Sequence, residues 1–181
     1  MMIQMVSALA ELSRLEDPDD MLRFEVMSAI EVIDGAFEQV SPEAKMRGVE
    51  IAREVQDGVV MHADRRRITL AVTNVLSNAV KHSPEGAVTT LKVFLDAGQV
   101  HFVVTDHGPG FPPEDASHLF EKYFRSAAER QRKVPGSGLG LYIVKTVAER
   151  HKGRVEARAA ATGGAEFEIV IPQGPVGTQG R

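Results

Sequence analysis

The chain has 181 residues, of which 43% are hydrophobic and 25% charged, and its formal net charge is −4. This length and composition are ordinary for one soluble globular domain with a short additional element. The absence of cysteine excludes disulfides, thiolate metal ligands and a cysteine nucleophile, and the slight acidity gives no general attraction to nucleic acid or to a membrane surface.

The first predicted element is a helix over residues 1–16. Its apolar residues follow a 3-4-3 spacing, which is typical of a two-heptad seam. The residues of the seam are Met2, Met5, Leu9 and Leu12. Two interpretations stay open: an amphipathic helix packed on its own domain, or a fragment of a dimerisation helix. The acidic segment 17–20 contains a proline and ends the helix.

Helices and strands then alternate. Helices are predicted over Glu25–Phe37, Arg65–His82 and Leu141–His151, and the second of them stops where Ser83-Pro84 follows, because proline cannot continue a helix. The predicted strands are Val49–Glu54, Val59–His62, Val88–Leu95, Val100–Asp106, Arg154–Ala160 and Ala165–Ile171. The turns at 96–98 and 163–164 make the last four strands into two hairpins. This order predicts a helix layer on a mixed sheet.

The predicted helix ending at His82 carries the first of four motifs, NVLSNAVKH. At 100° per residue, one face holds Asn74, Asn78, Lys81 and His82. Asparagine is a poor helix former, whereas its carboxamide oxygen is a neutral ligand suited to Mg²⁺ that shares phosphate oxygens with a substrate. A plain solvated face fits the same pattern. The opposite, apolar stripe consists of Ile68, Val72, Val75, Leu76 and Ala79.

Three further motifs follow. The segment 106–110, DHGPG, ends a strand, where an aspartate can accept a hydrogen bond from an exocyclic amine and glycines let the backbone approach a flat ligand. An ordinary turn fits the same residues. The segment 120–125, FEKYFR, either anchors a loop or contacts a ligand. The segment 136–141, GSGLGL, opens a helix, where free backbone N–H groups suit phosphate. It departs from both the dinucleotide fingerprint and the Walker-type phosphate loop.

Taken in this order, the four motifs resemble the N box, first glycine box, F box and second glycine box of the histidine kinase catalytic domain. The resemblance covers about residues 20–172. It implies an α+β two-layer sandwich in which about three helices cover one face of a mixed, mostly antiparallel sheet, with ATP between the helices and a flexible lid at 111–135. It divides the chain into the end of a dimerisation helix (1–16), the catalytic and ATP-binding domain (17–172) and a disordered tail (173–181).

The resemblance also implies roles for individual residues. Asn78 matches a Mg²⁺-binding asparagine, Lys81 a phosphate-contacting lysine, Asp106 an adenine-binding aspartate and Arg125 a basic residue that reaches the γ-phosphate. Asn78, Lys81 and Arg125 are therefore the expected catalytic residues. The other expected nucleotide contacts are Asn74, His82, Gly108, Gly110, Phe120, Tyr123, Gly136, Gly138, Leu139, Gly140 and Leu141. The basic residues expected to clamp the triphosphate from the lid are Lys122, Arg125, Arg130, Arg132 and Lys133.

Position 74 helps to choose between hydrolysis of ATP and transfer of its γ-phosphate. The histidine kinase domain resembles a wider superfamily that includes gyrase and the mismatch-repair ATPases. Its hydrolysing members resemble one another in having a general-base glutamate four residues before the metal-binding asparagine, and here that position is Asn74. Together with the F box, this favours transfer of the γ-phosphate to a histidine. The implied partners are a dimerisation and phosphotransfer domain and a response regulator, within a homodimeric parent that binds no nucleic acid.

The chain's own histidines lack the sequence context of a phosphoacceptor, so we expect it to bind Mg-ATP without phosphorylating itself. Two alternatives remain: an anti-sigma type serine kinase, and a nucleotide-binding scaffold or pseudokinase. The F box and the N-terminal seam argue against the first, and the intact boxes argue against the second. The absence of cysteine and of any long apolar run fits a cytoplasmic chain, and leaves open whether a parent protein is anchored to a membrane.

Overall fold

The computed structural model describes residues 2–17, 19–126, 136–161 and 163–176, without the side chains of residues 2–5 and 7. The elements in chain order are α1 (Met2–Glu16), β1 (Glu25–Ser28), α2 (Ala29–Arg47), β2 (Glu50–Val55), β3 (Val60–Ala63), α3 (Arg65–His82), β4 (Val88–Asp96), β5 (Gln99–Thr105), the 3₁₀ turn η1 (Pro113–Asp115), α5 (Gly140–Arg150), β6 (Arg154–Ala159) and β7 (Ala165–Pro172). Among these described residues, no helix is long and apolar enough to cross a membrane.

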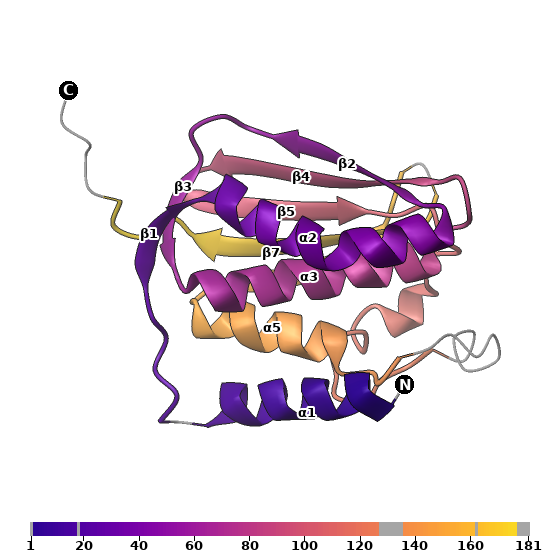
Figure 1. The fold of residues 1–181 in the computed structure, drawn as a ribbon, viewed down its shortest axis with the longest axis horizontal. Coiled ribbons are helices and arrows are strands. Elements are labelled where there is room, and N and C mark those ends of the chain that lie inside the picture. The colour runs from indigo at the N-terminus through magenta and orange to yellow at the C-terminus, as the bar shows by residue number, and fades with distance from the viewer. Residues whose placement is uncertain (1, 18, 127–135, 162, 177–181) are drawn as a thin grey trace.

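Five strands form one mixed sheet in the order β2-β4-β5-β7-β6. The pair β2–β4 is parallel, and the other pairs are antiparallel. Strands β1 and β3 form a separate antiparallel ribbon. Helices α2, α3 and α5 lie side by side over one face of the large sheet (Figure 1). The predicted α+β sandwich with two C-terminal hairpins is thereby confirmed.

The core lies between this helix layer and the sheet. The apolar stripe predicted on the helix 65–82 faces inward, and each of its five residues is at most 1% exposed. Helix α3 begins at Arg65 because Asp64 caps it by accepting the backbone N–H of Arg67, and it ends before Pro84. Both ends match the prediction.

Helix α2 differs from the prediction at both ends. Residues 25–28 pair with β3 as a strand, and the helix begins only at Ala29, where Ser28 and Glu31 form a reciprocal capping box. It continues through Pro42, at the loss of one intrahelical bond, and ends at Arg47 beside the left-handed Gly48 (φ 65°). The predicted helix Glu25–Phe37 is therefore wrong in its bounds, because strand pairing with β3 is a long-range property.

Helix α1 confirms the first predicted helix and lies outside the three-helix layer, along α5 (Figure 1). Its inner face buries Leu12 and Leu15, each 3% exposed. At the C-terminal end of α1, the guanidinium of Arg150 donates to the backbone oxygen of Leu15 at 3.0 Å. In this structure α1 therefore packs on the rest of the chain through its inner face and its C-terminal end.

After Pro172 the chain leaves the sheet but is still hydrogen-bonded to the domain. The backbone N–H of Gln173 donates to the oxygen of Gly98 at 2.9 Å, and its own carbonyl accepts from His62 N at 2.7 Å. The first residue assigned to the disordered tail is therefore hydrogen-bonded to β3 and to the β4–β5 turn. Residues 177–181 of that tail lie outside the described part of the chain.

Candidate functional site

The C-terminal half of α3 presents the polar face predicted for it. The side chains of Asn78, Lys81 and His82 are half-buried. One turn earlier, the Nδ2 of Asn74 donates to the backbone oxygen of Leu70 at 2.9 Å. A methyl group built on Gly140 would lie 3.1 Å from the Oδ1 of Asn74. The first motif therefore packs directly on the beginning of α5, where the fourth motif lies.

Asp106 lies immediately after β5 and is only 2% exposed. Its Oδ1 accepts two backbone hydrogen bonds, from Gly108 N at 2.8 Å and from Ala165 N at 3.1 Å. Burial raises the pKa of this carboxyl, while the two backbone donors oppose the shift because they favour the charged form. The chain thus keeps a carboxyl group in a place where ionising it costs free energy, which is typical of functional groups.

Glycines bring the second motif against α3 and against the last hairpin. A methyl group on Gly108 would lie 2.7 Å from the carbonyl oxygen of His82, so a larger residue would push the loop off the end of α3. Gly110 has φ 66°, and a methyl group there would lie 3.0 Å from the oxygen of Gly164. The segment 106–110 is therefore held between α3 and the β6–β7 hairpin.

The third motif is anchored at one end and tied to the fourth motif at the other. The ring of Phe120 meets Phe167 of β7 edge-on, with ring centroids 6.5 Å apart. The backbone N–H of Tyr123 donates to the oxygen of Gly138 at 2.9 Å. Tyr123 has φ 63° and a 56% exposed side chain. Gly138 has φ 70°, and a methyl group there would lie 2.7 Å from the carbonyl carbon of Tyr123.

The remaining predicted site residues differ in how deeply they are buried and in whether the structure describes them. Leu139 is fully buried in the core, and Leu141 packs against that core from its edge. Gly136 is exposed and Arg125 is half-buried. The predicted basic clamp divides: Arg130, Arg132 and Lys133 lie outside the described residues, whereas Lys122 pairs with Glu16 of α1 at 2.6 Å.

The sequence reasoning missed two groups of residues at this site. Gly164, read only as a hairpin turn, has φ 92°, and a methyl group there would lie 2.1 Å from the oxygen of Asp106. Ala165 exchanges hydrogen bonds with Asp106 through its own N–H and carbonyl. The double glycine was the available signal. The contact of Glu16 with Lys122 left no signal, because more than 100 residues separate them.

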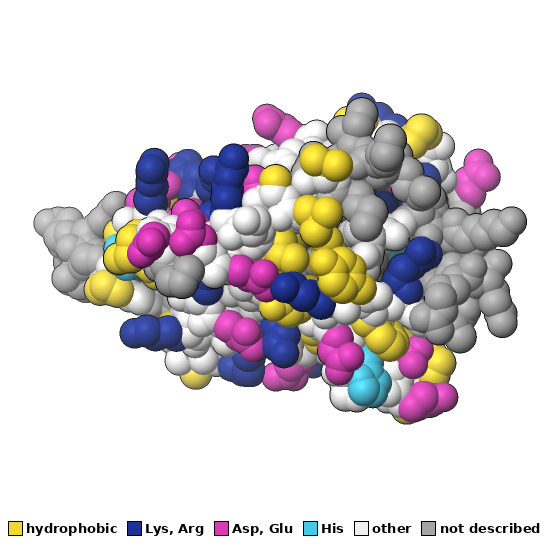
Figure 2. Space-filling view, turned by 90° about the horizontal axis from the view of Figure 1, so that it is seen from below, with side chains coloured by type: hydrophobic (Ala, Val, Ile, Leu, Met, Phe, Trp, Pro, Cys, Tyr) yellow, Lys and Arg dark blue, Asp and Glu magenta, His cyan; other side chains and the backbone are white. Residues whose placement is uncertain are grey.

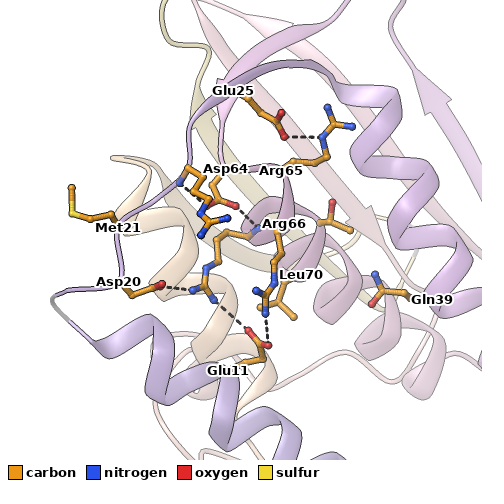
Figure 3. Close-up of a pocket in the computed structure, with 12 residues that line it drawn as sticks. Glu11, Asp20, Met21, Glu25, Gln39, Asp64, Arg65, Arg66 and Leu70 are labelled. Carbon is orange, nitrogen blue, oxygen red and sulfur yellow. Dashed lines mark hydrogen bonds and ion pairs between the residues drawn. The ribbon is translucent and has the colours of Figure 1, made fainter.

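A cavity of about 590 Å³ lies elsewhere, between α1, the segment after it and the N-terminal half of α3 (Figure 3). Acidic and basic side chains line it and pair with one another: Arg66 with Glu11 at 2.8 Å, and Arg65 with Glu25 at 2.9 Å. The buried Arg67 pairs with Glu11 at 3.3 Å and with Asp20. None of the predicted nucleotide contacts lines this cavity, so its charges hold α1 and the following segment against α3.

The sequence of this chain is similar to a known protein family and to several sensor kinases. The sequence model of the family described as "Histidine kinase-, DNA gyrase B-, and HSP90-like ATPase" matches residues 63–175. The chain is 30% identical over 168 residues to the sensor-like histidine kinase SenX3 of Mycobacterium tuberculosis (strain ATCC 25618 / H37Rv), covering 93% of this chain and 41% of that protein. It is 32% identical over 180 residues to the sensor protein SphS of Synechococcus elongatus, covering 95% and 44%. The chain thus spans less than half the length of these relatives.

Solved structures of histidine kinases superpose on this chain. The mycobacterial sensor histidine kinase MprB superposes with a TM-score of 0.74 at 35% identity, covering 85% of this chain and all of that one. Full-length ShkA in complex with AMPPNP superposes with a TM-score of 0.80 at 28% identity, covering 94% of this chain and 35% of that one. The catalytic domain of ThkA, at 21% identity and a TM-score of 0.74, shares the fold.

Proposed function

Because this chain belongs to the family of histidine kinase-, DNA gyrase B- and HSP90-like ATPases, we propose that it binds Mg-ATP and donates the γ-phosphoryl group to a histidine of a dimerisation and phosphotransfer domain. It would act as the catalytic domain of a two-component sensor histidine kinase. The observation that carries this proposal is the convergence on α3: its end meets the Asp106 loop through Gly108, and its asparagine face meets the start of α5 through Gly140.

The residues fit a purine nucleotide with a bound divalent cation. The buried Asp106 is suited to accept a hydrogen bond from the adenine amine, and a ligand donor there would return part of the desolvation cost. The Oδ1 of Asn78 is the proposed Mg²⁺ ligand. Lys81 and Arg125 would neutralise phosphate charge. When bound, ATP supplies the phosphoanhydride bond that is broken, and the residues contribute positioning and charge neutralisation.

Asn74 favours transfer over hydrolysis. Its amide nitrogen is engaged by Leu70 O, and its oxygen lies against Gly140. A carboxamide has no proton-accepting group at neutral pH, so this position cannot activate water as a general base. The acceptor would therefore be a side chain supplied by another domain, and the isolated chain would retain no phosphate.

The proposed partners follow from the same assignment. The structure of ThkA in complex with the response regulator protein TrrA shows such a partner for that kinase. For this chain we propose a response regulator, and a homodimeric, cytoplasmically exposed kinase assembly in which α1 is the end of a dimerisation helix. Support for this role of α1 comes from its position outside the three-helix layer.

The binding test is calorimetric titration of ATP with and without Mg²⁺. The hydrogen bond of a charged acceptor contributes about 1.5–3 kcal/mol, so Asp106→Asn should weaken binding roughly ten- to hundredfold. Asn78→Ala should abolish the strengthening by Mg²⁺. Asp96→Asn, an exposed aspartate in the β4–β5 hairpin, and Gln39→Ala, exposed on α2, are the matched controls. Wild-type chain that binds no ATP with Mg²⁺ present would refute the proposal.

The transfer test uses γ-labelled ATP and a separately supplied helical hairpin with an acceptor histidine. Label should appear on the hairpin and be lost in acid, as expected for phosphohistidine, and none should stay on this chain. Acid-stable label would instead indicate a serine kinase. Binding without any transfer to any supplied hairpin would favour a nucleotide-sensing scaffold.

A further inference from the structure

A polar contact between α1 and the third motif stands outside the proposed nucleotide contacts. Glu16, the last residue of α1, lies with Oε1 2.6 Å from the Nζ of Lys122 and accepts the hydroxyl of Tyr142 at 3.0 Å. The same Nζ lies 5.2 Å from the centroid of the Tyr142 ring. We call these three residues, from α1, the F-box loop and α5, the Glu16 clasp.

The clasp holds the loop that carries the third motif. Lys122 directly precedes Tyr123, whose backbone N–H closes the loop onto Gly138. Phe120, two residues before Lys122, packs on β7, and Arg125 follows three residues after it. Fixing the Lys122 side chain on α1 therefore restrains the middle of a loop whose ends carry a core anchor and a proposed phosphate contact.

The surface around α1 carries both apolar and charged side chains, and only the charged contact specifies one position of the F-box loop. Hydrophobic side chains gather near the middle of that surface, with basic and acidic ones around them (Figure 2). The side chains of Val6 and Leu9 of α1 and of Tyr123 of the loop are exposed. Apolar contact alone is non-directional, whereas an ion pair with a second hydrogen bond specifies one position of the loop. The hydrogen bond with Lys122 lowers the pKa of Glu16, and the same bond raises the pKa of Lys122, so both stay charged at neutral pH.

We propose that Glu16 is a positioning residue for nucleotide binding: by holding Lys122 and Tyr142, it keeps the F-box loop on Gly138 and so pre-organises the nucleotide site. This rests on the proposed function, and it adds that the placement of α1 sets nucleotide affinity. The side chains of Glu16 and Lys122 are 39% and 37% exposed, so solvent screens the pair and its effect should be modest.

The experiment compares wild-type chain with Glu16→Gln in two readouts. Hydrogen exchange of the Tyr123 amide reports on the loop without nucleotide, and titration of ATP with Mg²⁺ reports on the site. We expect the Tyr123 amide to exchange roughly two- to fivefold faster and ATP to bind more weakly by a similar factor. The double variant Glu16→Lys with Lys122→Glu should restore most of both values, since it re-forms the ion pair with exchanged charges but not the hydrogen bond that Tyr142 donates to Glu16.

Glu149→Gln is the control, because Glu149 is an exposed partner of Lys145 on α5 and touches no part of the clasp. Unchanged Tyr123 exchange in Glu16→Gln would overturn the proposal, and so would an equal effect of Glu149→Gln. Changed exchange with unchanged ATP affinity would also overturn it. If wild-type chain bound no ATP, the proposed function would fail, while the exchange readout would still show whether Glu16 holds the loop.

Discussion

Two titratable side chains, those of Asp106 and His151, are buried in fixed positions at a cost in folding free energy. Asp106 keeps a carboxyl group in the interior, where two backbone donors offset part of the desolvation of its charged form. Such a group is expected where a ligand later supplies another donor. His151, 4% exposed, is also buried, and burial likewise favours its uncharged form, the neutral ring.

His151 holds the start of α3. Its Nε2 accepts the backbone N–H of Asp64, the residue that caps α3, at 3.1 Å, and its Nδ1 donates to the oxygen of Val147 at 2.8 Å. This assigns the neutral tautomer with the proton on Nδ1. A proton on Nε2 would remove the acceptor for Asp64. Burial accordingly lowers the pKa of His151 below its ordinary value.

We therefore expect acid to destabilise the fold through His151. Because its folded pKa is lowered, the unfolded chain binds more protons as pH falls below about 6.5, and stability declines from there until the folded pKa is passed. The loss is about 1.4 kcal/mol for each unit of lowering. Urea denaturation at pH 7.5 and 5.5 measures it, and His151→Gln should reduce the difference between the two pH values. The exposed, non-titrating Gln39→Ala should leave it unchanged. Equal pH dependence in all three chains would contradict this account.

At the scale of elements, the β6–β7 hairpin completes the site from the side opposite α3. Its two turn glycines both have positive φ, 86° at Gly163 and 92° at Gly164. A methyl group on Gly163 meets no atom within 4 Å, whereas one on Gly164 would lie 2.1 Å from the oxygen of Asp106. The hairpin therefore contacts the loop 106–110 through one of its two glycines.

This pair gives a matched test. Gly163→Ala should cost about 1–2 kcal/mol of stability, because an L-residue is strained at positive φ. Gly164→Ala should cost more, because its methyl group would also overlap the backbone oxygen of Asp106. Gly164→Ala should in addition displace Asp106 and weaken ATP binding by tenfold or more, while Gly163→Ala should bind as wild type. Thermal unfolding and calorimetry on the same samples separate the two effects. Equal affinities in the two variants would show that the hairpin does not position Asp106.

The elements that the sequence predicted well are those whose signal is local. Helix α3 has a capping aspartate, a 3.6-residue apolar period and a terminating proline, and it was predicted to the residue. The four strands of the two C-terminal hairpins carried turn glycines between them. In contrast, the local pattern of residues 25–28 predicts helix, and only their pairing with β3 makes them the strand β1.

The residues of the candidate site divide in the same way, into those with a local sequence signal and those whose contacts depend on distant segments. The resemblance of the four motifs supplied the residues on α3, on the Asp106 loop and at the start of α5, which lie together in the structure. Contacts that depend on distant segments left no pattern in the sequence, among them Ala165 on Asp106 and Glu16 on Lys122. Lys122 shows the consequence: the sequence predicts it among the basic residues at the triphosphate, whereas in the structure its side chain pairs with Glu16 of α1.

At the scale of the whole molecule, α1 stands apart from the helix layer and joins it through three kinds of contact. Leu12 and Leu15 enter the core, Arg67 and Arg150 hold the end of α1 and the segment after it, and the Glu16 clasp reaches the F-box loop. Helix α1 has 15 residues, a length that is marginal for an isolated helix in water. Its order therefore depends on docking, and we expect it to open before the rest of the domain.

Leu12→Ala tests this hierarchy. Truncating a buried leucine costs about 2–5 kcal/mol, and we expect that loss to fall on α1 alone: its amides should exchange much faster, while those of α3 keep their protection. Leu9→Ala, on the same helix but 38% exposed, is the control and should change neither. If protection in α1 and α3 fell together, α1 would belong to a single cooperative unit with the core. Because Glu16 lies one turn after Leu12, release of α1 should also free Lys122, so Leu12→Ala should reproduce the faster Tyr123 exchange of Glu16→Gln without touching the clasp itself.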